Sequence, residues 1–240
     1  MIPFLVKLIL AHLIGDFILQ PTSWVQHKNL RSYKSIYLYL HILIHFILLL
    51  LLLWVHQVMI CLIIALSHWI IDVLKIEYTR KYHKITRTAF FVDQILHLLV
   101  IVAVTYSLYY NAWNEWWINI SMYKLMILLT CIILVTQVSS IVVKQIMSYW
   151  NINFNNEENS LKNAGKYIGI LERILIFTFV ISNQPASVGF LVAAKSIFRF
   201  NDLSRDKDRK ITEYILIGTF LSFTLAWLIA WMYLYLNSFF

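Results

Sequence analysis

Residues 37–55 read YLYLHILIHFILLLLLLWV, a stretch without a single charged side chain. Its length matches the roughly 20 apolar residues with which a helix crosses the hydrocarbon core of a bilayer. Because that core holds no water, a crossing segment must satisfy its own backbone hydrogen bonds, as a helix does. His41 and His45 interrupt the apolar sequence four residues apart. The stretch therefore predicts a membrane helix that carries two imidazoles on one face.

The rest of the chain has the same apolar character. Of its 240 residues, 60% are hydrophobic and 13% are charged, whereas about 25% are charged in soluble domains. The apolar runs are far longer than the roughly ten-residue segments of a membrane β-barrel. We therefore predict an all-α fold, a polytopic membrane helix bundle with about eight membrane segments. These segments are residues 2–19, 37–55, 58–76, 89–110, 123–146, 167–183, 186–200 and 214–236.

The basic residues predict the orientation of these segments. If all of them cross, most of the 20 Lys and Arg residues lie on the side of loops 20–36, 77–88, 147–166 and 201–213. Lys and Arg accumulate in cytoplasmic loops, so this side is expected in the cytoplasm and both termini outside it. The net charge of +8 thus has an explanation that involves the membrane and no nucleic acid.

The polar residues 151–163 divide the sequence into two parts. We predict a bundle in residues 1–150 and a three-segment membrane part in residues 151–240. Within the latter, segment 186–200 is shorter than the roughly 20 residues of a full span. It is compatible with a tilted crossing or a re-entrant helix.

Four pairs of ionisable residues occupy the first four segments, one pair in each. Members of a pair stand four residues apart, which places both side chains on one helix face about 6 Å apart along the axis. The pairs are His12 with Asp16, His41 with His45, His68 with Asp72, and Asp93 with His97.

Neighbouring segments run in opposite directions, and the order within the pairs inverts accordingly. The prediction is therefore two layers in a bundle of four helices. The layer nearer the cytoplasm contains Asp16, His41, Asp72 and Asp93. The layer one turn deeper contains His12, His45, His68 and His97. Soluble four-helix bundles build dinuclear metal centres from inward-facing ligands in this manner.

An unpaired carboxylate is costly in hydrocarbon, so intramembrane ionisable groups indicate a function. A divalent cation would neutralise the carboxylates and bind the imidazole lone pairs. Imidazole with carboxylate suits zinc, manganese or iron, and we expect one or two such ions. Hydrogen bonds between His and Asp could instead hold the four segments together without metal. Haem is disfavoured, because three carboxylates would then have no role.

The C-terminal part carries fewer ionisable residues. Glu172 and Arg173 lie in the sixth segment and Lys195 in the seventh, all within about two turns of the cytoplasmic side. Glu172 and Lys195 are a candidate buried ion pair. Such a pair could serve packing between segments or catalysis.

The stretch AHLIGDFILQP at residues 11–21, together with the three later pairs, resembles a family of bacterial membrane proteins known as domain of unknown function 3307. The likeness covers roughly the first half of the chain. The pattern is more loosely similar to inner-membrane proteins described as metal-dependent hydrolases. The resemblance implies a bacterial cytoplasmic membrane protein, and it implies a metal site more firmly than a reaction.

The leading hypothesis is a membrane-embedded, metal-dependent hydrolase. Metal held by the four pairs would lower the pKa of a bound water to about 7. Asp93 and Asp72 are the expected catalytic carboxylates, Asp93 as the proton acceptor. A lipid-linked ester or phosphoester could reach the site from the cytoplasmic interface.

Two alternatives are also compatible with the sequence. One is a transporter for a divalent cation or a proton-coupled solute, with the two layers as a transit site. The other is a non-catalytic membrane partner in which metal or hydrogen bonds only hold the bundle. Apart from Lys7, the outer halves of the first four segments are nearly all apolar, which favours a one-sided site over a pore.

Overall fold

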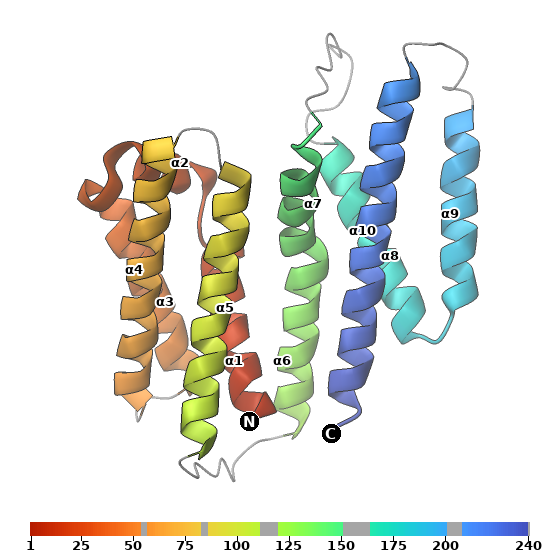
Figure 1. Cartoon of the computed structure of the whole chain (residues 1–240). Coiled ribbons are helices and arrows are strands. Elements are labelled where there is room, and N and C mark those ends of the chain that lie inside the picture. Colours follow the sequence, from red (N-terminus) through yellow and green to blue (C-terminus); the bar gives the residue numbers. More distant parts are fainter. Residues whose placement is uncertain (54–56, 83–85, 111–119, 151–163, 201–207, 240) are drawn as a thin grey trace. The chain divides into compact units, whose positions relative to one another are not determined.

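The computed structural model describes residues 1–53, 57–82, 86–110, 120–150, 164–200 and 208–239. These residues are almost entirely helical and include no strand (Figure 1). The prediction of an all-α fold is confirmed. The joint predicted at residues 151–163 lies outside the described residues.

The chain divides into two compact units, residues 1–130 and 131–240. The boundary falls within a helical run, whereas the division predicted at residue 151 remains a prediction. The first unit contains α1 (Ile2–Leu13), the π-helical turn η1 (Ile14–Ile18), α2 (Thr22–Arg31), the 3-10 turn η2 (Ser32–Lys34), α3 (Ile36–Leu53), α4 (Val58–Tyr82), α5 (Thr86–Tyr110) and most of α6 (Ile120–Ile133). The second contains the π-helical turn η4 (Leu134–Val138), α7 (Ser139–Met147), α8 (Ala164–Ile181), α9 (Pro185–Phe200) and α10 (Asp208–Asn237).

Five helical stretches in the described ranges are long and apolar enough to cross a membrane, as expected of an integral membrane protein. They are Ile36–Leu53, Val58–Tyr82, Arg87–Leu108, Ile120–Met147 and Lys210–Asn237. The bent pair Ile2–Ile18 and Thr22–Lys34 makes a sixth if it is counted as one span. Helix α8 carries three charged residues, and α9 has 16 residues. Neither meets the same requirements, so the count of about eight spans is not confirmed.

Residues 20–36, predicted as a loop, are instead largely helical. Pro21 ends the first helical run because it has an extended backbone and no N–H to continue the ladder. The chain then turns by 84° into α2. The rings of Trp24 and Tyr37 stack with centroids 5.1 Å apart, and α2 packs against α3 and α4. This helix covers one end of the first unit.

Helices α1, α3, α4 and α5 pack against one another in a closed order, each beside two neighbours. Figure 1 shows these helices side by side in the first unit. Their contacts away from α2 are apolar, as is usual where van der Waals packing holds helices together in lipid. The buried residues of this core are Phe4, Leu8, Ala11, Leu49, Leu53, Cys61, Ile64 and Ile101.

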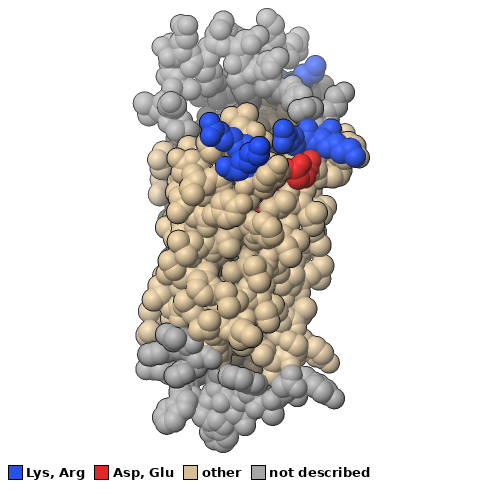
Figure 2. Space-filling model, turned by 90° about the vertical axis from the view of Figure 1, so that its left-hand side faces the viewer, with Lys and Arg blue, Asp and Glu red and all other residues tan. Residues whose placement is uncertain are grey.

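Charged side chains gather at one end of the first unit, near α2. Figure 2 shows Lys and Arg together at this end, above a broad band without charge. We call it the basic end; its residues include Lys28, Arg31, Lys34, Arg80 and Lys81, which lie on α2, η2 and the last turn of α4. Exposed leucines on the helix surfaces, such as Leu51 and Leu66, suit contact with lipid.

Candidate metal centre

The structure brings the side chains of all four pairs together between α1–η1, α3, α4 and α5. Seven of these residues are buried, and the side chain of Asp16 is 10% exposed. The two side chains of each pair therefore face the space between the four helices, as their spacing of four residues predicts. The distances between their ligand atoms determine whether these side chains could hold a metal ion.

Four imidazoles form the deeper layer. The ring centroids of His45 and His68 are 3.9 Å apart, and those of His68 and His97 are also 3.9 Å apart. His12 lies 5.1 Å from His97 and 5.9 Å from His45. One ring from each helix thus contributes to a compact layer of imidazoles.

Asp16 lies at the centre of the cluster. Its Oδ1 atom is 3.0 Å from Nε2 of His45, 3.2 Å from Nε2 of His41 and 3.4 Å from Nε2 of His68. Its Oδ2 atom is 3.8 Å from Nε2 of His12. One carboxylate therefore faces imidazoles from α1, α3 and α4.

Local backbone structure explains how α1 and α3 approach each other. Asp16 lies in the π-helical turn Ile14–Ile18, a feature that often occurs at functional sites. Beside it, a Cβ atom at Gly15 would overlap the imidazole ring of His45. Glycine at this position therefore leaves the space that His45 occupies.

We expect Gly15→Ala to lower the free energy of unfolding by about 1–3 kcal/mol, because the added methyl group must displace His45. Gly165→Ala is the matched control, since no described atom beyond its chain neighbours and its own helix backbone lies within 4 Å of its added Cβ. Thermal unfolding of both variants in detergent checks this. Equal melting temperatures for the two variants would contradict the packing argument.

Two lysines enter the cluster that the sequence did not assign to it. Lys28 Nζ donates to Asp72 Oδ2 at 2.7 Å, and Lys75 Nζ donates to Asp93 Oδ2 at 2.6 Å. Lysines therefore neutralise two of the three carboxylates of the cluster. Among the described side chains, only Asp16 of the three carboxylates has no ion pair with a lysine.

Gln94 joins the two layers. Its amide nitrogen donates to Asp16 Oδ2 at 3.0 Å and to Asp93 Oδ2 at 3.1 Å. Its amide oxygen lies 3.3 Å from Nε2 of His12. This bridging role has no signal in the charge pattern, because the side chain is neutral.

The ligand atoms of the inner part of the cluster lie at separations that suit a metal ion. A tetrahedral zinc ion with ligands at about 2.0–2.1 Å requires ligand atoms about 3.3 Å apart. The separations of 3.0 and 3.4 Å between Asp16 Oδ1 and the Nε2 atoms of His45 and His68 are close to this value. Three groups have ligand atoms within 4.8 Å of one another: His12, Asp16, His45 and His68; His41, His68 and Asp72; and Asp72, Asp93 and His97.

The third group contains two buried polar atoms that lack a hydrogen bond. Within the described ranges, Asp93 Oδ1 and His97 Nε2 are buried without a hydrogen bond, although they lie 3.4 Å apart. Leaving such atoms unsatisfied costs about 1–3 kcal/mol each. A cation at this position would bind both atoms, so the outer group is a second candidate ion site.

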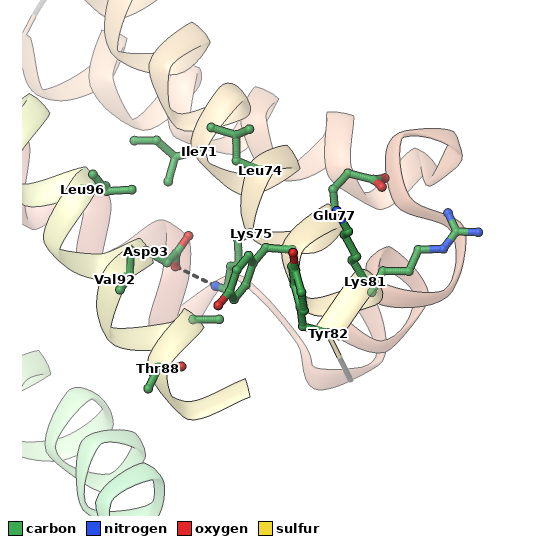
Figure 3. A pocket seen from close by; sticks show the side chains of 13 residues that line it. Ile71, Leu74, Lys75, Glu77, Lys81, Tyr82, Thr88, Val92, Asp93 and Leu96 are labelled. Carbon is green, nitrogen blue, oxygen red and sulfur yellow. Dashed lines mark hydrogen bonds and ion pairs between the residues drawn. The ribbon is translucent and has the colours of Figure 1, made fainter. Parts of the chain in front are cut away.

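A groove connects this outer group with the surface. It has a volume of about 1000 Å³ and lies between the end of α4 and the start of α5. The ion pair of Lys75 and Asp93 lies in its wall (Figure 3). Asp93 is therefore shared by the buried cluster and the groove.

The three C-terminal candidates belong to the second unit. Lys195 Nζ donates to Glu172 Oε2 at 2.6 Å, which is the ion pair that the sequence suggested. Arg173 is buried and donates to the carbonyl oxygen of Val135 at 2.6 Å and to Ser222 Oγ at 2.9 Å. It thus satisfies a carbonyl of the π-helical turn η4, and its contacts are those of a structural residue.

A family model described as "Protein of unknown function (DUF3307)" matches residues 4–126. The chain belongs to this family. The match contains all eight residues of the four pairs and lies within the first unit. No curated protein and no solved structure matches the chain. DUF3307 carries no activity in its description, so the function must be argued from the site.

Proposed function

We propose that this DUF3307 protein is a membrane-embedded, metal-dependent hydrolase that acts on an ester or phosphoester. The observation that carries the proposal is the groove that reaches Asp93, a carboxylate with one oxygen free of hydrogen bonds. Catalytic sites combine a concave surface with ionisable groups held in an unusual environment. Asp93 meets both conditions, because it lines the groove and belongs to the buried cluster.

The proposed ligands follow from the two candidate ion sites. The inner site would use His12, Asp16, His45 and His68, and the outer site Asp72, Asp93 and His97, with His41 between them. Zinc, manganese or iron bound there would supply a hydroxide nucleophile at neutral pH. The Lys28–Asp72 and Lys75–Asp93 contacts orient the outer carboxylates.

Asp93 is proposed as the general base. Its Oδ2 atom is held by Lys75 and Gln94, and its Oδ1 atom accepts the proton of water in the state in which only the inner site holds an ion. The water oxygen forms a bond to the acyl carbon or phosphorus, the bond to the leaving oxygen breaks, and the proton passes from Asp93 to that oxygen. The products are an acid and an alcohol, so atoms and charge balance.

The proposed topology places the basic end in the cytoplasm, because Lys and Arg are retained there. In this arrangement α8 and α9 also lie in the membrane, the span count is about eight and both termini are outside the cytoplasm. The membrane is proposed to be the bacterial cytoplasmic membrane. The site then lies on the cytoplasmic side of the bilayer.

Apolar packing beyond the imidazole layer favours a one-sided site. Leu8, Leu49, Ile64 and Ile101 each stand four residues from a histidine of the deeper layer, and all are buried. They share with those histidines a cavity of only about 10 Å³. A transport pathway requires polar groups at successive depths, and beyond the histidines Ser67 is the one polar residue among the described residues that line this cavity.

The two Lys–Asp pairs favour a second candidate function. Lys28 and Lys75 neutralise two carboxylates without any metal. In this alternative the cluster is a hydrogen-bonded core of a non-catalytic membrane partner. The two candidates differ in whether metal stabilises the protein and whether the groove supports hydrolysis.

We expect Asp93→Asn to slow hydrolysis by about 100-fold, the lower range for loss of a general base. The assay uses protein purified in maltoside micelles with Zn²⁺ or Mn²⁺ and the soluble substrates p-nitrophenyl phosphate and p-nitrophenyl butyrate. The inner ion should be retained, because Asp93 is not among the inner ligands.

Glu213→Gln is the control, since it removes an exposed carboxylate of α10 that belongs neither to the groove nor to the cluster. It should leave the rate within about twofold of the native rate. Native activity in Asp93→Asn would exclude Asp93 as the base. No hydrolysis of either substrate by metal-loaded native protein would reject the proposed function for these two ester classes.

A further inference from the structure

The groove beside Asp93 lies between α4 and α5. On α4 it uses Ile71, Leu74, Lys75 and Tyr78, which recur every three or four residues along one side, and the residues at the end of the helix, which are Glu77, Arg80, Lys81 and Tyr82. On α5 it uses Thr88, Ala89, Val92, Asp93 and Leu96, again along one side. Figure 3 shows the side chains of Leu74, Lys75, Val92, Asp93 and Leu96 around the groove.

The two ends of the groove differ in polarity. Leu74 and Val92 are 60% and 55% exposed, although both stand on helices apolar enough to cross a membrane. In a bilayer such side chains face acyl chains. This part of the groove is therefore suited to hydrocarbon.

The other end carries positive charge. Arg80 and Lys81 line it, together with Lys75, whose side chain is 33% exposed. The one acidic residue there outside the cluster, among the described lining residues, is Glu77, which accepts a hydrogen bond from Ser32. The rings of Tyr78 and Tyr82 lie 5.0 Å apart, as aromatic residues often do at the membrane interface.

We propose that the groove binds one anionic phospholipid, with its phosphate near Lys75 and Lys81 and an acyl chain along Leu74 and Val92. The charge at one end and the apolar walls at the other match the two parts of such a molecule. A peptide fits less well, because its backbone polar groups would lie unsatisfied against hydrocarbon.

An anionic phospholipid bound in the groove would be the substrate of the proposed hydrolase. This catalytic role rests on the proposed function, whereas lipid binding itself does not. Lys75 donates to Asp93 at 2.6 Å, so a phosphate bound at Lys75 is also close to the proposed base. The hydrolysed bond is then an ester or phosphoester bond near the head group of the lipid. The acyl chain serves to anchor the lipid.

Lipid binding is tested by native mass spectrometry of protein in maltoside micelles with a chelator present, titrated with dioleoyl phosphatidylglycerol or dioleoyl phosphatidylcholine. We expect the anionic lipid to bind at least about tenfold more tightly, because each basic residue near a membrane surface contributes about 1 kcal/mol. Arg80→Ala/Lys81→Ala should weaken its binding about 10- to 30-fold.

Two matched controls separate the groove from the rest of the surface. Arg31→Ala/Lys34→Ala removes the same charge from the basic end but outside this groove, and it should weaken binding by less than about threefold. Val92→Trp should block the groove and abolish binding. Val102→Trp, at a similarly exposed position of α5 outside the groove, should not.

Equal losses in the two double variants, or equal binding of both lipids, would overturn the proposal. Because this binding is measured without metal, it fails independently of the hydrolase. If p-nitrophenyl substrates are cleaved but no lipid binds, the lipid inference falls and the hydrolase stands. If lipid binds selectively but nothing is cleaved, the lipid site stands and the catalytic role falls.

Discussion

Asp16→Asn is expected to weaken zinc binding by at least about 100-fold, because it removes the negative charge from a central ligand. Loss of a residue that only hydrogen-bonds to a metal ligand already lowers metal affinity by about 10- to 100-fold. Asp16 Oδ1 lies within 3.4 Å of three imidazole Nε2 atoms, so no other carboxylate in the cluster can replace it without movement of the helices. Competition titration against a chelator of known affinity measures the change.

The control for this variant is Glu77→Gln, which removes one negative charge from an exposed residue of the first unit. Its zinc affinity should stay within about twofold of the native value. Unchanged affinity in Asp16→Asn would show that the carboxylate is no ligand. The inner site would then have to consist of imidazoles alone.

Lys28→Met is expected to lower the free energy of unfolding by about 3–5 kcal/mol in metal-free protein, because it leaves Asp72 buried without a cation. The Lys28 and Asp72 side chains are each 6% exposed, so water cannot replace the ammonium group. Zinc should restore much of this loss, since a divalent ion held by the outer group also neutralises Asp72. Unfolding in the presence and absence of zinc checks both effects.

Lys34→Met provides the comparison, because Lys34 is an exposed residue of the same end. Its effect should stay within about 0.5 kcal/mol. If zinc does not rescue Lys28→Met, the cluster depends on its lysines alone, as the non-catalytic alternative requires.

The central part of the site is predictable from sequence for a simple physical reason. A helix places residues four apart on one face. A pair such as His41 with His45 therefore indicates which face of the helix points into the bundle and how deep in the membrane the two side chains lie. Apolar surroundings then leave the bundle interior as the place where ionisable groups are least costly. The same reasoning applies to the other three pairs, and the structure brings all eight side chains together.

The contributions of Lys28 and Lys75 could not be derived in the same way. Lys28 reaches Asp72 because the chain turns by 84° after Pro21 and α2 folds back over the helix ends. Periodicity within one helix carries no information about such a turn. Lys75 stands near the basic end, where positive-inside bias alone explains its charge, so its pairing with Asp93 has no distinct signal.

Gly15 and the π-helical turn form a third feature that sequence left unassigned. The turn changes which residues of Ile14–Ile18 face the bundle, and a regular helix period would not predict it. Glycine beside an aspartate is a common sequence element, and its purpose becomes apparent only when His45 is seen in the space of the missing side chain.

The metal content of native protein distinguishes a metal centre from a hydrogen-bonded cluster. Protein purified in detergent, reconstituted with Zn²⁺, Mn²⁺ or Fe²⁺ and freed of excess ion, is analysed by inductively coupled plasma mass spectrometry, with protein quantified by amino-acid analysis. We expect about one or two ions per native chain, and less than half of that in Asp16→Asn. Native protein that neither copurifies with metal nor takes it up on reconstitution would show that the His/Asp cluster is no metal centre.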